Sequence, residues 1–279
     1  MTDIPMGAAY APGAASRPAG PPDEILAAFA EPAQQNRLTV LARIILAIPH
    51  LVVLWALGIA AEIVVIICWF AALFLGRLPA GLAGFITGYL SWLFRVQAYL
   101  FLLTDRYPPF ELGAADYPVQ LQLRPGPLNR LAVFFRLILA IPAHIVTMLV
   151  ILGMETIVMF ITWLIVLIAG RMPRALYEAI AAGLRYYIRF TGYLFLVTAT
   201  YPWGLFGDEA SQPAEGTGWI GGDQPWRLVL SSGAKGLVGM FLAIGVLVAA
   251  LYGVLIGVAT SSSNTTTSPA AAVRSVDTP

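Results

Sequence analysis

The feature that most restricts the fold is an almost uncharged apolar run of about 38 residues, from Leu38 to Leu75. As one helix it would be about 57 Å long at 1.5 Å per residue, against a hydrocarbon core of about 30 Å. The run therefore predicts a hairpin of two transmembrane helices that turns near Gly58 and Glu62. The composition agrees, since 59% of the residues are hydrophobic and 11% are charged, where soluble domains carry about 25%.

Most of this run belongs to a segment that occurs twice. The pattern from Arg37 to Pro49-His50 recurs 93 residues later and ends at Pro142-Ala-His144. The stretch that starts at Trp69 recurs from Trp163 at an offset of 94, so one residue is inserted between Pro142 and Trp163. We predict two tandem copies of one membrane unit, with the second hairpin turning near Gly153 and Glu155.

The matched motifs together resemble the bacterial membrane family called domain of unknown function 4389. They are Arg-x5-Arg-x-Ile-Leu-Ala-Ile-Pro with a following His, then Trp, Gly-Arg-x-Pro, Arg-x3-Tyr and Tyr-Pro. The resemblance covers about residues 37–112 and 129–203. The second copy departs from it at Trp203-Gly204 and by the insertion of Ala143 before His144. The resemblance implies a helical membrane fold and no particular activity.

Residues 80–103 and 174–197 differ from the apolar runs because they contain arginines, which are costly inside a bilayer. We expect amphipathic helices at the cytoplasmic interface; the alternative is a spanning helix whose arginine is paired inside the bundle. With two spans per copy, fifteen of the sixteen basic residues fall on one side of the membrane. Three spans per copy would place Arg130 and Arg136 outside, against the positive-inside rule.

The predicted fold is therefore an all-α integral membrane protein: two repeats of a transmembrane hairpin plus an interfacial helix, then one transmembrane helix. Short strands are expected at Pro118–Leu123 and Pro225–Leu230, and a short helix at Asp23–Ala30. The predicted divisions are a disordered cytoplasmic tail (1–36), repeat 1 (37–112), a linker (113–128), repeat 2 (129–206), a cytoplasmic linker (207–234), a transmembrane helix (235–259) and a disordered extracytoplasmic tail (260–279).

Polar residues inside the apolar runs are the candidate sites. His50 and His144 suggest a haem held between the copies, or a cap on the carbonyls freed by Pro49 and Pro142. Glu62 and Glu155 suggest proton or ion carriers, or residues of an outer turn. Four repeated arginines suit lipid phosphates or snorkelling anchors: Arg43, Arg95, Arg136 and Arg189.

The sequence contains no phosphate-binding glycine loop, zinc helix or nucleophile elbow, and its net charge of +1 does not suit nucleic acid. We expect no catalysis, cofactor or metal. The leading hypothesis is a scaffold or accessory subunit of a complex in a bacterial inner membrane, with lipids and other membrane proteins as partners. The alternatives are a small transport or lipid-handling protein and a haem-binding protein. The N-terminus is expected in the cytoplasm and the C-terminus outside.

Overall fold

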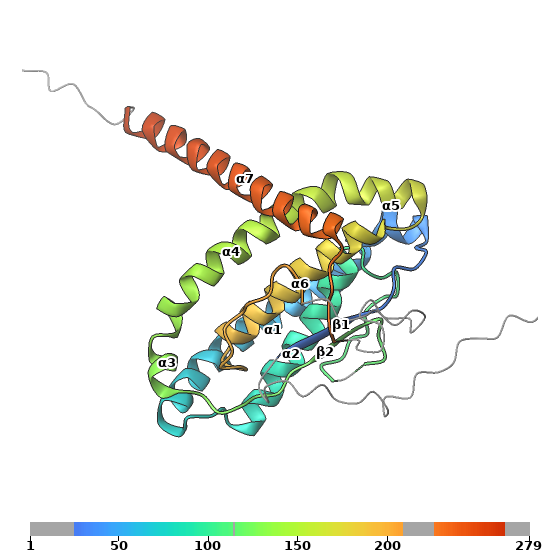
Figure 1. Ribbon diagram of the computed structural model, residues 1–279. Coiled ribbons are helices and arrows are strands. Elements are labelled where there is room, and N and C mark those ends of the chain that lie inside the picture. The colour runs from blue at the N-terminus through green and yellow to red at the C-terminus, as the bar shows by residue number, and fades with distance from the viewer. Residues whose placement is uncertain (1–24, 114, 209–225, 266–279) are drawn as a thin grey trace, which may run out of the picture.

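A computed structural model describes residues 25–113, 115–208 and 226–265, and the predicted disordered tails fall largely outside them. The described chain is mostly helical, with two short strands (Figure 1). Its elements are β1 (Leu26–Phe29), α1 (Arg37–Leu75), α2 (Ala80–Leu100), β2 (Val119–Gln122), α3 (Arg130–Phe134), α4 (Arg136–Ile157), η1 (Val158–Thr162), α5 (Trp163–Ala169), α6 (Arg174–Leu194) and α7 (Ser232–Thr265). Within these described ranges, three helical stretches are long and apolar enough to cross a membrane: residues 37–75, 136–169 and 232–261.

The apolar run of the first copy is one helix, so the predicted hairpin is wrong. α1 has 39 residues and passes through Gly58 and Glu62 without a turn. The side chain of Asn36 caps its first turn, and Gly76 ends it with a left-handed φ of 68°. The helix need not reverse because its buried residues recur every three, four or seven positions, and this single stripe packs against α2.

The second copy also lacks its expected hairpin, since α4, η1 and α5 continue one another past Gly153 and Glu155. η1 is a short π-helix, whose i→i+5 turn holds one residue more than the i→i+4 turn of an α-helix. It lies between Pro142 and Trp163, where the sequence places the inserted residue. Positions before η1 therefore correspond at an offset of 93, and positions after it at 94.

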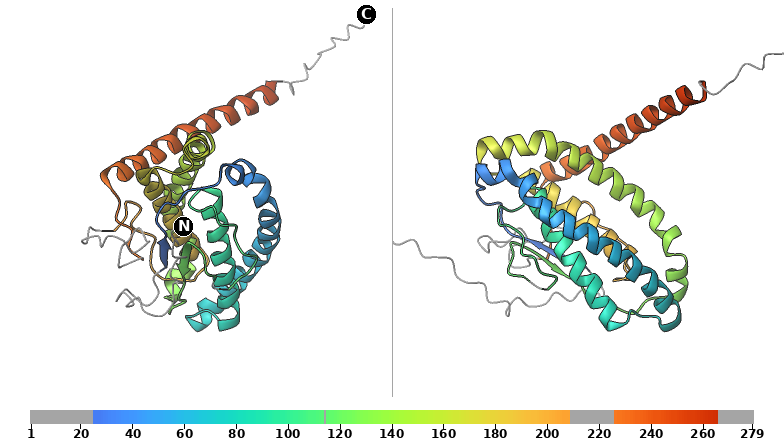
Figure 2. Two further views of the ribbon diagram at one scale, coloured as in Figure 1. Left: turned by 90° about the vertical axis from the view of Figure 1, so that its right-hand side faces the viewer. Right: turned by 180° about the vertical axis from the view of Figure 1, so that it is seen from behind.

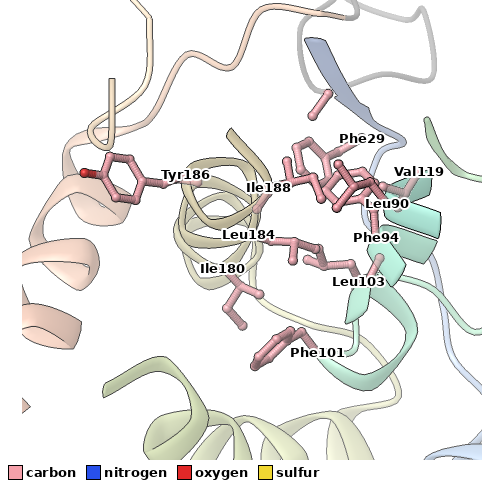
Figure 3. Packing of buried hydrophobic residues seen from close by; sticks show 14 of the residues in the cluster. Phe29, Leu90, Phe94, Phe101, Leu103, Val119, Ile180, Leu184, Tyr186 and Ile188 are labelled. Carbon is pink, nitrogen blue, oxygen red and sulfur yellow. The ribbon is translucent and has the colours of Figure 1, made fainter. Parts of the chain in front are cut away.

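α2 and α6 pack against one another and supply many residues of the main apolar core. Their place at the cytoplasmic interface stays a prediction. Leu90 and Phe94 of α2 face Leu184 and Ile188 of α6 in the main apolar core (Figure 3). These two pairs occupy equivalent positions at the offset of 94. Arg95 of α2 and Arg185 of α6 are buried, as in the alternative prediction, whereas Arg174 at the start of α6 is exposed. No spanning by these helices follows from that.

The strands also differ in part from prediction. β2 confirms the strand expected at 118–123, but its antiparallel partner is β1, in the region where a short helix was expected. Residues 226–230, where another strand was expected, form none. Leu26 pairs with Gln122 and Phe29 pairs with Val119. At the offset of 93, Leu26 corresponds to Val119 and Phe29 to Gln122, so the first residue of each strand pairs with the last residue of the other.

Reciprocal contacts of this kind also join the rest of the two halves. We call β1, α1 and α2 the first module, and β2 and α3–α6 the second module. The amide of Gln35 donates to the carbonyl of Gly170 at 2.7 Å, and the equivalent amide of Leu128 donates to the carbonyl of Gly76 at 2.8 Å. Each module thus binds the end of the other's long helix. The modules are related by an approximate two-fold rotation, and α1 runs antiparallel to α3–α5 (Figure 2).

α7 crosses α4 steeply and then leaves the body of the molecule (Figures 1 and 2). The crossing requires two glycines. A Cβ on Gly153 would lie 1.8 Å from the carbonyl oxygen of Phe241, and one on Gly245 would lie 2.0 Å from that of Leu149. From residue 246 to 261 every residue of α7 except Val248 is exposed. The helix extends beyond both predicted ends, 235 and 259.

Candidate functional site

The most polar part of the first module lies around Arg43, on the inner face of α1. Only 2% of Arg43 is exposed. Its guanidinium donates to the backbone carbonyls of Tyr99 and Thr104, lies 4.4 Å from the centre of the Tyr99 ring, and forms a 3.0 Å ion pair with Asp105. It also donates to the side chain of Gln35. The cluster fastens the chain after α2 to the first turns of α1.

Arg136 repeats this arrangement in the second module. It is 2% exposed, donates to the carbonyl of Thr198 at 2.8 Å, and lies 4.0 Å from the centre of the Tyr193 ring. Ala199 stands where the first module has Asp105. Within the described residues no carboxylate forms an ion pair with Arg136.

Arg95 and Arg189 occupy equivalent places on α2 and α6, and both bind backbone. Arg95 donates to the carbonyls of Glu111 and Gly113, and burial lowers its pKa from the ordinary value. Arg189 donates to the carbonyl of Ile25 at 3.2 Å. All four repeated arginines therefore hold the chain itself. A contact with lipid phosphate stays a prediction.

Arg185 and Asp208 form an ion pair that the sequence did not reveal. Arg185 is 1% exposed, and its Nη1 lies 2.7 Å from Oδ2 of Asp208, which also accepts from the amide of Leu228. Burial by itself would raise the pKa of Asp208, but these hydrogen bonds and the charge of Arg185 hold it below the ordinary value. The carboxylate comes from a loop 23 residues further on, with no counterpart in the first module to identify it.

The two histidines do not occupy equivalent positions, and the structure does not bring them together. The offset of 93 applies before η1, so His50 corresponds to Ala143 and not to His144. His50 is buried, its ring stacks on Phe110 with centroids 3.8 Å apart, and its Nδ1 accepts from the indole of Trp92 at 3.2 Å. The capping hypothesis had the ring donate to a carbonyl freed by Pro49. Nδ1 does not do so, because it accepts a hydrogen bond from Trp92.

His144 is exposed, and its ring lies 5.6 Å from that of Phe190 in the second module. The aromatic neighbours of His50 all belong to the first half of the chain. A haem held between both rings would require each to leave this packing. The haem hypothesis therefore gains no support from the geometry.

Glu62 lies within α1, and the equivalent Glu155 lies near the end of α4, where the helix continues into η1. Both are exposed, and neither lies at a turn, so their assignment to outer turns is wrong. Among the described residues no three His, Cys, Asp or Glu side chains cluster as a metal site would require. Cys68 is a buried free thiol.

A small open hollow of about 110 Å³ lies beside Arg189. It is lined by Ile25, Arg189, Thr198, Thr200, Tyr201, Pro202 and Trp203. Sites for small molecules usually measure about 300–1,000 Å³. At about 110 Å³ the hollow is smaller than these sites.

The comparisons with known proteins agree with the repeat. No curated protein and no solved structure matches the chain. A family model described as a domain of unknown function, DUF4389, matches residues 37–111 and again 130–205. The matches start at α1 and at α3, and together they cover more than half of the chain. The chain therefore belongs to the DUF4389 family and contains two tandem copies of its domain.

Proposed function

We propose that this protein is a non-catalytic scaffold or accessory subunit of a larger complex in a bacterial inner membrane. The observation that carries the proposal is the use of the buried arginines. Arg43, Arg95, Arg136 and Arg185 all donate to carbonyls of their own chain. A buried guanidinium that donates its hydrogen bonds to backbone carbonyls stabilises the fold, and those N–H groups are not available to bind a substrate.

The surface supports membrane partners. Large apolar side chains are exposed along the whole of α1, from Leu38 to Leu75, and along α3–α5, from Leu131 to Ile168. Soluble monomers seldom expose such continuous apolar surface. Lipids are therefore expected to cover the long helices, and the projecting half of α7 is the surface we assign to a helix of another membrane protein. We place the N-terminus in the cytoplasm and the end of α7 outside.

The experiment compares two faces of that projecting half. The protein, tagged and expressed at its native level, is purified in a mild detergent, and co-eluting proteins are quantified by mass spectrometry. Leu247, Leu251 and Val254 share one face and are replaced together by Ala. Tyr252 and Ile256, on another face, are replaced in the matched control. All five are exposed.

We expect a protein at constant stoichiometry with the wild type, lost in one of the two variants and kept in the other. Retention of every co-eluting protein in both variants would contradict a helical partner on α7. Absence of any stoichiometric protein, with one lipid class retained, would contradict the accessory role and favour lipid handling.

A further inference from the structure

The two ends of α1 are joined by polar, non-helical chain. At the start of α1, the carboxylate of Asp105 accepts from the amide of Asn36 at 2.9 Å and from the hydroxyl of Thr39 at 2.7 Å. At its other end, the amide of Leu128 donates to the carbonyl of Gly76. Residues 106–127 must therefore pass from one end of the helix to the other.

That connection carries charged side chains, and part of its described length is exposed. Arg106 and Asp116 form an ion pair with side chains 54% and 85% exposed. Glu111 and Arg124 lie on the same connection, whose described residues form no helix. Exposed non-helical backbone cannot cross hydrocarbon, because its polar groups would lose their hydrogen bonds to water. Both ends of α1 must therefore lie on the same side of the membrane.

The second module leads to the same result. Thr198 binds Arg136 in the first turn of α4, whereas the amide of Ser231 donates to Glu178 in the first turns of α6, close to where α5 ends. The chain after α6 thus also returns from one end of a long helix to the other. Its described residues on either side, 199–208 and 226–231, form no helix.

The two-fold relation between the modules gives an independent argument. If α1 and α3–α5 crossed the bilayer, their antiparallel directions would place Arg37 and the equivalent Arg130 on opposite sides. If both lie along the membrane with their exposed apolar residues toward the hydrocarbon, the axis is perpendicular to the membrane and the arginines of both modules lie on one side. The second arrangement agrees with the positive-inside rule.

We infer that both modules are embedded in the cytoplasmic leaflet, with α1 and α3–α5 lying along the bilayer and only α7 crossing it. The ligand of the apolar face is the hydrocarbon of that leaflet. Residues with large exposed fractions occur along the whole of both helices, from Leu38 (74%) to Phe74 (74%) and from Leu131 (67%) to Ile168 (66%). A helix of 39 residues is about 58 Å long, nearly twice the hydrocarbon thickness, and fits this orientation without a large tilt.

The length of α7 fits as well. Residues 246–261, which project beyond α4, are about 24 Å long at 1.5 Å per residue. A helix lying in the membrane is about 10 Å thick. Together these lengths are close to the hydrocarbon core of about 30 Å, so the projecting half of α7 reaches the opposite surface.

Single cysteines in a Cys68→Ala background test the arrangement. Arg77→Cys and Arg171→Cys mark the two ends of the long helices, Glu62→Cys marks the middle of α1, and Ser261→Cys marks the end of α7. Each is labelled with a membrane-impermeant maleimide in intact cells and in inside-out vesicles. We expect only Ser261→Cys to react in cells, and only Arg77→Cys and Arg171→Cys to react in vesicles.

Two outcomes would overturn the inference. Reaction of one helix-end cysteine, but not the other, in intact cells would show that the long helices cross. Reaction of Glu62→Cys in intact cells would show that α1 reaches the outer surface as a hairpin. Nitroxides at the exposed residues Ile45, Ile59 and Ile66, in lipid nanodiscs, give a second measurement: each should be relaxed by oxygen, and none by a water-soluble nickel chelate.

Discussion

Trp69 and Trp163 make the same hydrogen bond in opposite directions. The indole of Trp69 in the first module donates to the carbonyl of Val133 at 3.0 Å. The indole of Trp163 in the second donates to the carbonyl of Val40 at 3.1 Å. Trp69 corresponds to Trp163 and Val40 to Val133, so each module places one donor and one acceptor in the contact. The two modules are held together by a reciprocal pair, as two subunits of a symmetric dimer would be.

Trp69→Phe and Trp163→Phe should destabilise the protein by similar amounts, about 1 kcal/mol each. Each change leaves a ring in place but removes the donor, which leaves a partly buried carbonyl without its partner. The measurement is thermal unfolding in detergent, followed by near-UV circular dichroism. Trp55→Phe is the matched control, because Trp55 lies on the same helix with 71% of its surface exposed. An effect of Trp55→Phe as large as the others would mean that loss of the indole itself, and not the contact between modules, is measured.

Asp105→Ala should lower the stability of the protein by about 1–3 kcal/mol, because buried Arg43 would lose its carboxylate and the start of α1 would lose two hydrogen bonds. Ala199→Asp should act in the opposite direction by supplying Arg136 with the missing partner. Ala199 is exposed, so the new side chain has room. Unfolding temperatures of both variants test the pair. A destabilising Ala199→Asp would contradict the equivalence of the two arginine clusters.

The repeat and its insertion could be predicted from the sequence, but the course of the long helices could not. The expected hairpins rested on matching helix length to bilayer thickness, which assumes that every long apolar helix crosses. The stripe of small buried residues on α1, including Ala47, Ala61 and Ala72, was the sequence signal for one continuous helix. Its spacing suits packing along a neighbouring helix over the full length.

The candidate sites were recovered in part. The repeated arginines were correctly singled out, but their partners are backbone carbonyls, which carry no sequence signature. The pairing of His50 with His144 was wrong because the position of the inserted residue decides which residues correspond, and only η1 locates it. The Arg185–Asp208 pair was missed because its partners lie on a core helix and a distant loop.

The Arg185–Asp208 ion pair should make stability depend on pH. The folded-state pKa of Asp208 is below its ordinary value, so the carboxylate contributes stability above the unfolded pKa of about 3.9 and loses it as the pH falls through the folded value. Asp208→Asn should therefore cost about 1–3 kcal/mol at pH 6–8, and the difference from wild type should shrink below about pH 4. Unfolding temperatures measured from pH 3 to 8 check this. Asp116→Asn, at a side chain that is 85% exposed, should show no such dependence.

Gly153→Ala and Gly245→Ala should each separate α7 from α4. The added methyl group would meet a backbone carbonyl at about half the normal contact distance, and backbone cannot move aside as a side chain can. We expect a loss of about 1–3 kcal/mol and faster proteolysis between α6 and α7. Gly239→Ala and Gly253→Ala are the controls, since a Cβ at either position meets nothing within 4 Å. They should be neutral or stabilise α7 by up to about 1 kcal/mol, because alanine favours a helix over glycine. If Gly153→Ala and Gly245→Ala were tolerated as well as the controls, α7 would not pack closely against α4. The inferred span of its projecting half across the rest of the bilayer would then lose its starting point.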